Sequence, residues 1–321
     1  MFRANLGAAL LMVLYGVAAA VPLPGFAEFE DLPVELGFWQ RLVTLGLRFQ
    51  GALGNAAYVA SYLMFSIFYS LYLWAWEAKP MAFRKISGYA TLALLFLVFI
   101  GLSGTRAALV GLLAATVGFG LFMILRSGRI GRTAAVLFGA LAVLSSLLFV
   151  LRHELVAKIP SIRILAVSWG EASVQCRLKV WEAAWKGFLD RPLFGWGPEN
   201  FLTVFDKYFD TRYCMEGQQT WWDRAHNIVF DCLAENGVIT FLAYCSIPVS
   251  FYGALFRKMR RDRRESGPTT LRRGLQQGLL FAMTIGYLTQ GLFMFDTLPI
   301  YISYSSVLAF AIYEFGLGSN Q

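Results

Sequence analysis

Charged residues are scarce in this sequence. They make up 15% of its 321 residues, whereas hydrophobic residues make up 57% and the mean hydropathy is +0.56. A soluble domain carries about 25% charged residues, so this composition excludes an ordinary soluble fold. The apolar residues lie in runs close to the roughly 20 residues that a helix needs to cross a bilayer.

The apolar runs define the predicted membrane spans. They are 4–21, 58–76, 88–103, 107–125, 133–151, 238–256, 274–293 and 299–316. Backbone groups in hydrocarbon must bond within their own segment, so each run should form a helix. The sequence therefore predicts an all-α polytopic membrane protein with about eight transmembrane helices. We expect one membrane domain over 1–321, with a large extracytoplasmic loop at 152–226 that bears short interfacial helices.

Basic residues indicate the orientation of these spans. They gather in the links 79–85, 126–132 and 257–273, and the last of these holds eight basic residues. The positive-inside rule assigns these links to the cytoplasm, so the links at 22–57, 104–106, 152–226 and 294–298 lie outside. The net charge of +8 then reflects topology and contact with anionic lipid, and no nucleic acid is expected. The predicted location is the bacterial inner membrane, with the active face outside the cytoplasm.

The first apolar run has a second interpretation. Arg3, the apolar stretch 6–17 and the small residues at 18–20 are also compatible with a cleaved signal peptide. Either interpretation places residue 22 outside, so the remaining topology is the same.

Cysteine and histidine are also few. Of the four cysteines, Cys176 and Cys214 fall in the outside loop, where a disulfide would survive, although two unpaired thiols fit equally well. The cysteine spacing does not resemble a zinc site, and we expect no metal and no cofactor. The two histidines are His153, which we interpret as interfacial, and His226.

The loop 152–226 is rich in tryptophan. Its apolar stripe Leu178, Trp181, Trp185 and Phe188 predicts an amphipathic helix near 174–190, and Pro198 is well placed to open another near 198–209. Such helices would lie on the membrane surface. The tryptophans fit an interfacial belt, or a cleft in which their faces pack on sugar rings.

Three residues are candidates for chemistry. Arg106 opens a helix on the outside, against both the positive-inside rule and the helix dipole, which suggests an anion ligand such as phosphate. An arginine that reaches lipid phosphate is the alternative. Arg177 begins the amphipathic helix. The alternative to a chemical role is an exposed surface arginine. His226 lies at the outer end of a span, where a neutral imidazole could accept a proton from a sugar hydroxyl.

Several of these motifs resemble the O-antigen ligase/polymerase family. The similar segments, in order over roughly 45–250, are 48–55 with its Arg…Gly-Asn, 103–106 with its Ser-Arg start of a span, Arg177 and Trp181, the Pro-x-Phe-Gly-x-Gly turn in 192–201, His226-Asn227, and 235–237. The turn and the His-Asn pair on one loop are the most specific pieces.

The resemblance implies a membrane glycosyltransferase that takes a glycan from undecaprenyl pyrophosphate without a metal. It maps the catalytic roles onto His226, Arg177 and Arg106. We expect substrate contacts at Arg48, Trp181, Trp196, Trp221, Trp222 and Asn227. Family members usually have ten to twelve spans, so a partner chain that supplies helices is compatible with this shorter chain.

The acceptor stays open among a lipid A core, a growing glycan and a protein hydroxyl. Two other classes compete with the enzyme. A transporter of lipid-linked glycans would need ionisable residues inside its spans, and these spans are almost bare of them. A non-catalytic homologue or scaffold could lose the arginines or the histidine, and all three are present.

Overall fold

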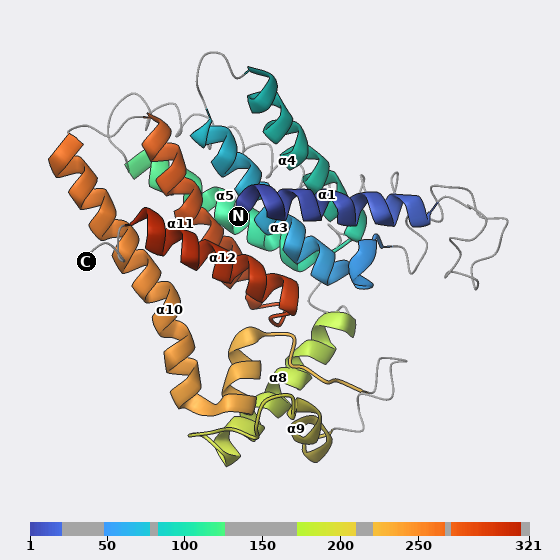
Figure 1. Cartoon of the computed structure of the whole chain (residues 1–321). Coiled ribbons are helices and arrows are strands. Elements are labelled where there is room, and N and C mark those ends of the chain that lie inside the picture. Colours follow the sequence, from blue (N-terminus) through green and yellow to red (C-terminus); the bar gives the residue numbers. More distant parts are fainter. Residues whose placement is uncertain (21–47, 78–82, 126–171, 210–220, 267–270, 316–321) are drawn as a thin grey trace. The chain divides into compact units, whose positions relative to one another are not determined.

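The computed structural model describes residues 1–20, 48–77, 83–125, 172–209, 221–266 and 271–315 (Figure 1). Every regular element in these ranges is a helix. The elements are α1 (Phe2–Ala19), η1 (Gly51–Leu53), α3 (Ala56–Trp76), α4 (Phe83–Ser103), α5 (Arg106–Leu125), α8 (Ala172–Asp190), α9 (Phe201–Lys207), α10 (Ile228–Ser266), α11 (Leu271–Gly291) and α12 (Leu298–Glu314).

The all-helical membrane class is confirmed. Among the described helices, α1, α3, α5 and α10 are long and apolar enough to cross a membrane, and the apolar part of α4, Gly88–Ser103, is shorter. Helices α11 and α12 cover most of the predicted spans at 274–293 and 299–316. The predicted span at 133–151 lies outside the described residues, so the count of eight spans stays a prediction.

The described helices fall into two compact units. Unit 1 contains α1 to α5, the end of α10 from Leu255, α11 as far as Gly286, and α12. Unit 2 contains α8, α9, the first part of α10 and the segment Tyr287–Asp296. Each unit is described by itself below.

Helix α3 is the core of unit 1. It packs against α1, α4, α5 and α12, and side chains along its whole length are buried. Its buried serines bond to carbonyls one turn back, as Ser66 does to Tyr62 at 3.0 Å and Ser70 does to Ser66 at 2.9 Å. These bonds satisfy the hydroxyls inside the helix itself, so α3 can be surrounded by other helices without unpaired polar groups.

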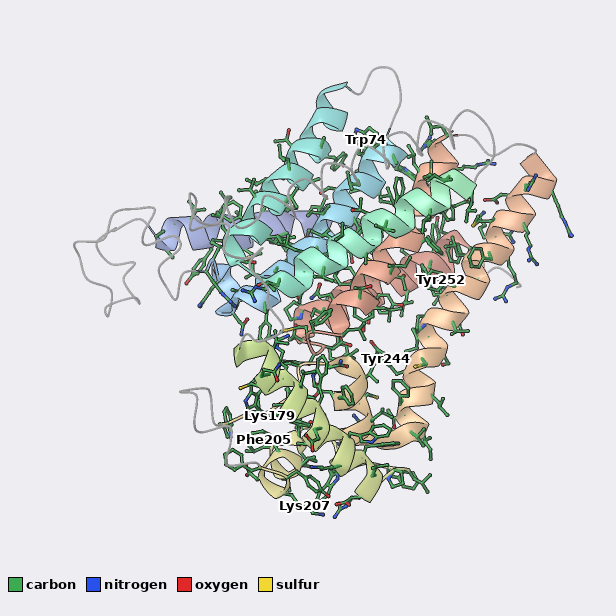
Figure 2. All side chains as sticks on the ribbon, turned by 180° about the vertical axis from the view of Figure 1, so that it is seen from behind. Trp74, Lys179, Phe205, Lys207, Tyr244 and Tyr252 are labelled. Carbon is green, nitrogen blue, oxygen red and sulfur yellow. The ribbon has the colours of Figure 1, made fainter. Side chains whose placement is uncertain are left out.

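The core of unit 2 is small and joins three elements. Val180 of α8 packs with Phe201, Val204 and Phe205 of α9, and with Ala234 of α10 (Phe205 is labelled in Figure 2). Further aromatic side chains pack against this cluster, namely Trp181, Trp196, Tyr208, Phe209, Trp222 and Phe230. Helix α9 begins three residues after Pro198, so the proline precedes the helix and does not open it.

The predicted helix near 174–190 exists as α8, and its apolar stripe is divided between the core and the surface. Leu178 and Trp185 are exposed, whereas the side chains of Cys176, Val180 and Ala184 are buried. The face of α8 that contacts α9 favours small residues, because α9 approaches closely. An added methyl group at Gly187, for example, would overlap the side chain of Val204. Trp181 of the stripe packs against the core cluster, whereas Leu178 and Trp185 stay exposed.

Candidate active site

A sharp backbone break in α10 organises unit 2. Gly237 has φ 73° and ψ 179°, which divides the element into a short helix before it and the long apolar helix that begins at Val238. The left-handed value of φ favours glycine, because other residues carry a Cβ that is strained there. The glycine of the Glu-x-Gly segment is therefore needed for the backbone conformation at the break.

The turn at 192–198 is bonded to this break. The backbone N–H of Trp196 donates to Ala234 O at 3.0 Å, that of Gly197 donates to Glu235 O at 2.7 Å, and that of Val238 donates to Pro192 O at 2.8 Å. These bonds satisfy helix-end groups that a break in the helix would otherwise leave unpaired. The Pro-x-Phe-Gly-x-Gly turn and the Glu-x-Gly segment are thus two halves of one joint.

Gly195 is required at this joint by both conformation and space. Its φ is +65°, and a Cβ on it would overlap the backbone carbonyl of Glu235. A side chain there would force the turn away from α10. At Gly195 the Pro-x-Phe-Gly-x-Gly turn therefore needs a close backbone approach and not a chemical group.

A buried ion pair fastens the same region. Arg224 donates to the Glu235 carboxylate at 2.8 Å, and the side chain of Glu235 is only 4% exposed. The second oxygen of Glu235 accepts from the backbone N–H of Phe201 at 3.1 Å, and Arg224 also bonds to Glu199 at the surface. One carboxylate therefore holds α9, α10 and the segment just before His226.

His226 is held in place from both sides along the chain. Before it, Ala225 donates its N–H to Asp231 at 2.6 Å and accepts at its carbonyl from the Trp181 indole at 3.0 Å. After it, Asn227 caps α10 by accepting from the N–H of Val229 at 2.9 Å. His226 itself has φ 51°, a left-handed conformation that costs a non-glycine residue of order 1–3 kcal/mol. The neighbouring bonds over-determine this conformation.

The imidazole of His226 packs against two aromatic rings. Its ring meets Trp222 and Phe295 edge to face, with centroids 5.0 Å and 5.1 Å away. Its Nδ1 is buried and has no hydrogen-bond partner among the described residues. Burial and the positive charge of Arg177 lower the pKa of His226 to about 4, although Asp223 opposes the shift. At neutral pH the ring is therefore uncharged and has a nitrogen available to accept a proton.

Arg177 belongs to the same site. It is half-buried on α8 and donates to the Phe293 carbonyl at 3.0 Å, two residues from the Phe295 ring that touches His226. The structure thus brings Arg177 and His226 together in unit 2, although 49 positions separate them in the sequence. A guanidinium beside a neutral imidazole suits an anionic substrate whose reaction releases a proton.

The predicted substrate-binding residues of unit 2 have different surroundings. Trp181 stacks on Phe230, Trp222 packs on His226, and Trp221 is 54% exposed. Trp196 donates its indole N–H to Gly187 O at 2.8 Å and lies under Arg191. The polar groups of Trp196 and Asn227 are thus used inside the fold, whereas Trp221 presents its ring outward. Cys176 is buried, and Cys214 lies outside the described residues.

The predicted basic residues of unit 1 meet at the turn between α4 and α5. Arg48 lays its side chain against Gly104, so that a methyl group there would be 3.4 Å from its Cγ. Arg106 follows two residues later and opens α5. Phe49 donates its backbone N–H to Leu102 O at 3.0 Å, which joins the two segments. Unit 1 therefore places Arg48 and Arg106 at one helix end.

Sequence reasoning gave no bonding role to the carboxylates of unit 2, although Glu235 belongs to the family-like segment 235–237. Asp231 and Glu235 are spaced four residues apart at the start of an apolar stretch, and this interruption was the available signal. Asp296 lies in the short link before α12 and accepts from the Tyr287 hydroxyl at 2.7 Å. That hydroxyl shares a 2.6 Å hydrogen bond with Tyr244, which is labelled in Figure 2. Burial raises the pKa of Asp296 to about 6.

Comparison with known proteins agrees with these features. No curated protein sequence matches the chain significantly. A family model described as O-antigen ligase matches residues 90–245, a range that contains Arg106, Arg177, His226 and both halves of the joint at Gly237. The match supports glycan transfer of the ligase or polymerase type in a membrane. Residues 90–245 of this chain therefore belong to the O-antigen ligase family.

Proposed function

We propose that this chain is a metal-independent membrane glycosyltransferase that moves a glycan from undecaprenyl pyrophosphate to an acceptor hydroxyl. The acceptor belongs to one of three classes: a lipid A core, a growing repeat-unit glycan or a protein. The observation that carries the proposal is His226, a neutral imidazole with an unpartnered buried nitrogen beside the Arg177 guanidinium.

The reaction follows from this pair. The acceptor oxygen attacks the anomeric carbon of the donor, the bond from that carbon to the pyrophosphate breaks, and the acceptor proton passes to His226. Negative charge grows on the leaving pyrophosphate, so the charge of Arg177 stabilises the transition state more than the ground state.

Donor binding would also adjust the base. The positive charge of Arg177 contributes to the low pKa of His226. An anionic pyrophosphate bound near Arg177 opposes that effect and raises the pKa of the imidazole toward the working pH. His226 would then be a stronger base when donor is present than when the site is empty.

Asp231 and Trp181 act as positioning residues in this proposal. Both bond to Ala225, the residue before His226, and neither needs to touch substrate. Arg48 and Arg106 form the basic pair of unit 1, and we propose that they bind phosphate.

The test is a transfer assay with purified chain, an undecaprenyl-pyrophosphate glycan and acceptors of the three classes, with and without EDTA. His226→Gln should lower the rate by about 10²–10⁴-fold, the usual contribution of a general base. Arg177→Gln should also lower it strongly. Lys186→Gln is the matched control, because it removes one positive charge from an exposed ion pair on the same helix.

The outcome separates the competing readings. Product formed by wild type and Lys186→Gln, but not by His226→Gln, supports the proposed base. Equal activity of His226→Gln and wild type would exclude it. If wild type is silent with every acceptor while another enzyme of the family works in parallel, independent catalysis is wrong and the scaffold or transporter reading gains support. The variants Arg48→Gln and Arg106→Gln show whether the reaction needs the pair of unit 1.

A further inference from the structure

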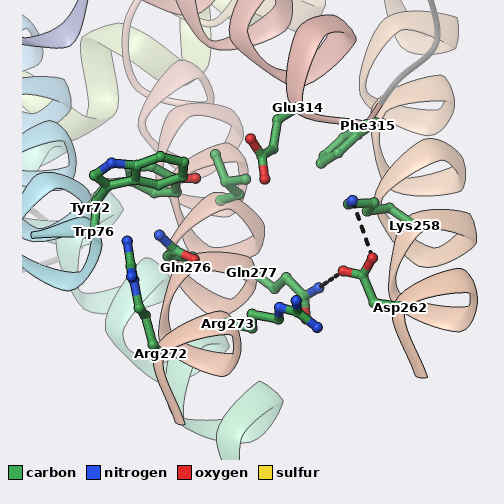
Figure 3. A pocket seen from close by; sticks show the side chains of 11 residues that line it. Tyr72, Trp76, Lys258, Asp262, Arg272, Arg273, Gln276, Gln277, Glu314 and Phe315 are labelled. Atoms are coloured by element: carbon green, nitrogen blue, oxygen red, sulfur yellow. Dashed lines mark hydrogen bonds and ion pairs between the residues drawn. The ribbon is translucent and has the colours of Figure 1, made fainter. Parts of the chain in front are cut away.

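Unit 1 contains a pocket of about 680 Å³ that is separate from the residues discussed above (Figure 3). It lies where four helices carry their polar ends: the last turns of α3 and α12, the first turns of α11, and the basic part of α10. Its charged lining residues are Lys258, Asp262, Arg272, Arg273 and Glu314, and its uncharged lining includes Trp76 and Gln276.

Two side chains of α11 enter the pocket without an ion-pair or hydrogen-bond partner for Arg272 or for the Gln276 amide nitrogen among the described residues. Arg272 lies over the Trp76 ring at 5.3 Å from its centroid and makes no ion pair within the described part of the chain. Gln276, one turn later, is only 9% exposed, yet its Nε2 has no hydrogen-bond partner there. Figure 3 shows both side chains pointing into the pocket from the same helix. A buried amide N–H₂ without an acceptor is costly, so this site is suited to a ligand with acceptor oxygens.

The remaining charges of the pocket are largely balanced among themselves. Lys258 pairs with Asp262 at 3.1 Å, and Asp262 also accepts from the Gln277 amide at 3.1 Å (Figure 3). Glu314 lines the opposite wall. With three basic and two acidic side chains, the lining has a net charge of +1. A single phosphodiester monoanion would make the pocket neutral.

The position of the pocket along its helices indicates which phosphodiester fits. Helix α3 is apolar and ends at Trp76, and the apolar run of α10 gives way to basic residues from Arg257 onward. Such a change from apolar to charged residues marks the depth of lipid headgroups, where tryptophan and tyrosine also concentrate. A phospholipid would place its phosphate at Arg272 and its acyl chains along the apolar helix surfaces.

We propose that this pocket binds the phosphodiester headgroup of an anionic phospholipid. The Arg272 guanidinium and the Gln276 Nε2 donate to the phosphate oxygens, and the Trp76 ring holds the guanidinium in place. The N-terminal turn of α11 adds its positive dipole end. This site is independent of the proposed glycan transfer, since none of its residues belongs to the candidate active site.

The test measures lipid binding to the purified chain in detergent by native mass spectrometry, with unfolding temperature as a second readout. The probes are phosphatidylglycerol, phosphatidylethanolamine, phosphatidylcholine and inorganic phosphate. Phosphatidylglycerol should bind at one copy per chain and raise the unfolding temperature. Arg272→Gln should weaken its binding about 10-fold to 100-fold, the range expected for charge-assisted hydrogen bonds.

Matched variants make the result specific. Gln276→Leu should also weaken binding and, without lipid, should unfold at a temperature no lower than wild type, because it removes the unpartnered amide. Arg260→Gln is the control. It removes the same charge from a residue that is exposed on α10 and lies outside the pocket. Equal weakening by Arg260→Gln and Arg272→Gln would overturn the site. Equal binding of all three lipids, or saturation by inorganic phosphate with no further effect of lipid, would overturn the anionic-lipid assignment.

Discussion

The ion pair between Arg224 and Glu235 gives the sharpest stability prediction. Arg224→Met keeps most of the side-chain length but removes the counter-charge of the Glu235 carboxylate. That carboxylate is only 4% exposed, so water cannot replace the lost partner. Breaking a buried ion pair from one side costs about 3–5 kcal/mol. We expect the lower end, about 3 kcal/mol, because the carboxylate keeps its bond from the Phe201 N–H.

This cost should appear as a lower unfolding temperature. For a domain of 150–250 residues, 3 kcal/mol corresponds to roughly 6–12 °C. A thiol-reactive fluorescent dye is a suitable probe, because all four cysteines lie between positions 176 and 245 and Cys232 is 8% exposed. Cysteine labelling on heating therefore reports the loss of this part of the fold.

Two further variants decide the cause. Glu199→Gln removes the other partner of Arg224. The side chain of Glu199 is 78% exposed, so this substitution should cost less than about 1 kcal/mol. Combining Arg224→Met with Glu235→Gln should recover part of the loss, because no unpaired buried charge remains. The reasoning is refuted if Arg224→Met melts within about 2 °C of wild type, or if the two substitutions are simply additive.

Three other predictions concern the same unit. Gly195→Ala should destabilise by about 2 kcal/mol or more in the same melting assay, since φ is +65° and its methyl group would overlap the Glu235 carbonyl; a Gly7→Ala control, with open space around it, should be nearly neutral. Because the pKa of His226 is lowered in the folded state, the unfolded chain binds the proton first as pH falls from 6.5 to about 4. Folding stability therefore decreases by up to about 3 kcal/mol over this range. The unfolding temperature of His226→Gln should depend less on pH there than that of wild type. The raised pKa of Asp296 gives the opposite pH dependence of stability. The stabilising protonation of Asp296 is complete below pH 3.8 and is lost as pH rises through about 6. Asp296→Asn should therefore raise the unfolding temperature at pH 7.5 and leave it nearly unchanged at pH 4, and the reverse order would contradict the assigned burial.

The sequence predicted the class of fold because membrane spans depend on local properties. A helix in hydrocarbon satisfies its own backbone groups, so long apolar runs such as 58–76 and 107–125 indicate helices without knowledge of their neighbours. Helix α8 was also found from periodicity. Which of its side chains face the core was not predictable, because that depends on the approach of α9 at Gly187, which leaves Trp185 exposed.

The site was predictable in part. His226 and Arg177 were identified from motifs, and unit 2 places them beside one another. Asp231, Glu235 and Arg224 were missed as partners, because their bonds join segments that only the folded chain brings together. Their roles as catalytic or positioning residues stay proposals until the variants are assayed.

What the sequence by itself determined is a membrane-embedded helical chain with a distinctive loop, because hydrophobicity and glycine or proline positions act locally. Only the tertiary structure decided why the motifs have their form. The turn at 192–198 and the break at Gly237 exchange backbone hydrogen bonds, so their glycines are fixed by a close approach across about 40 residues of chain. The neutral state of His226 likewise depends on burial and on Arg177, and both are properties of the folded environment.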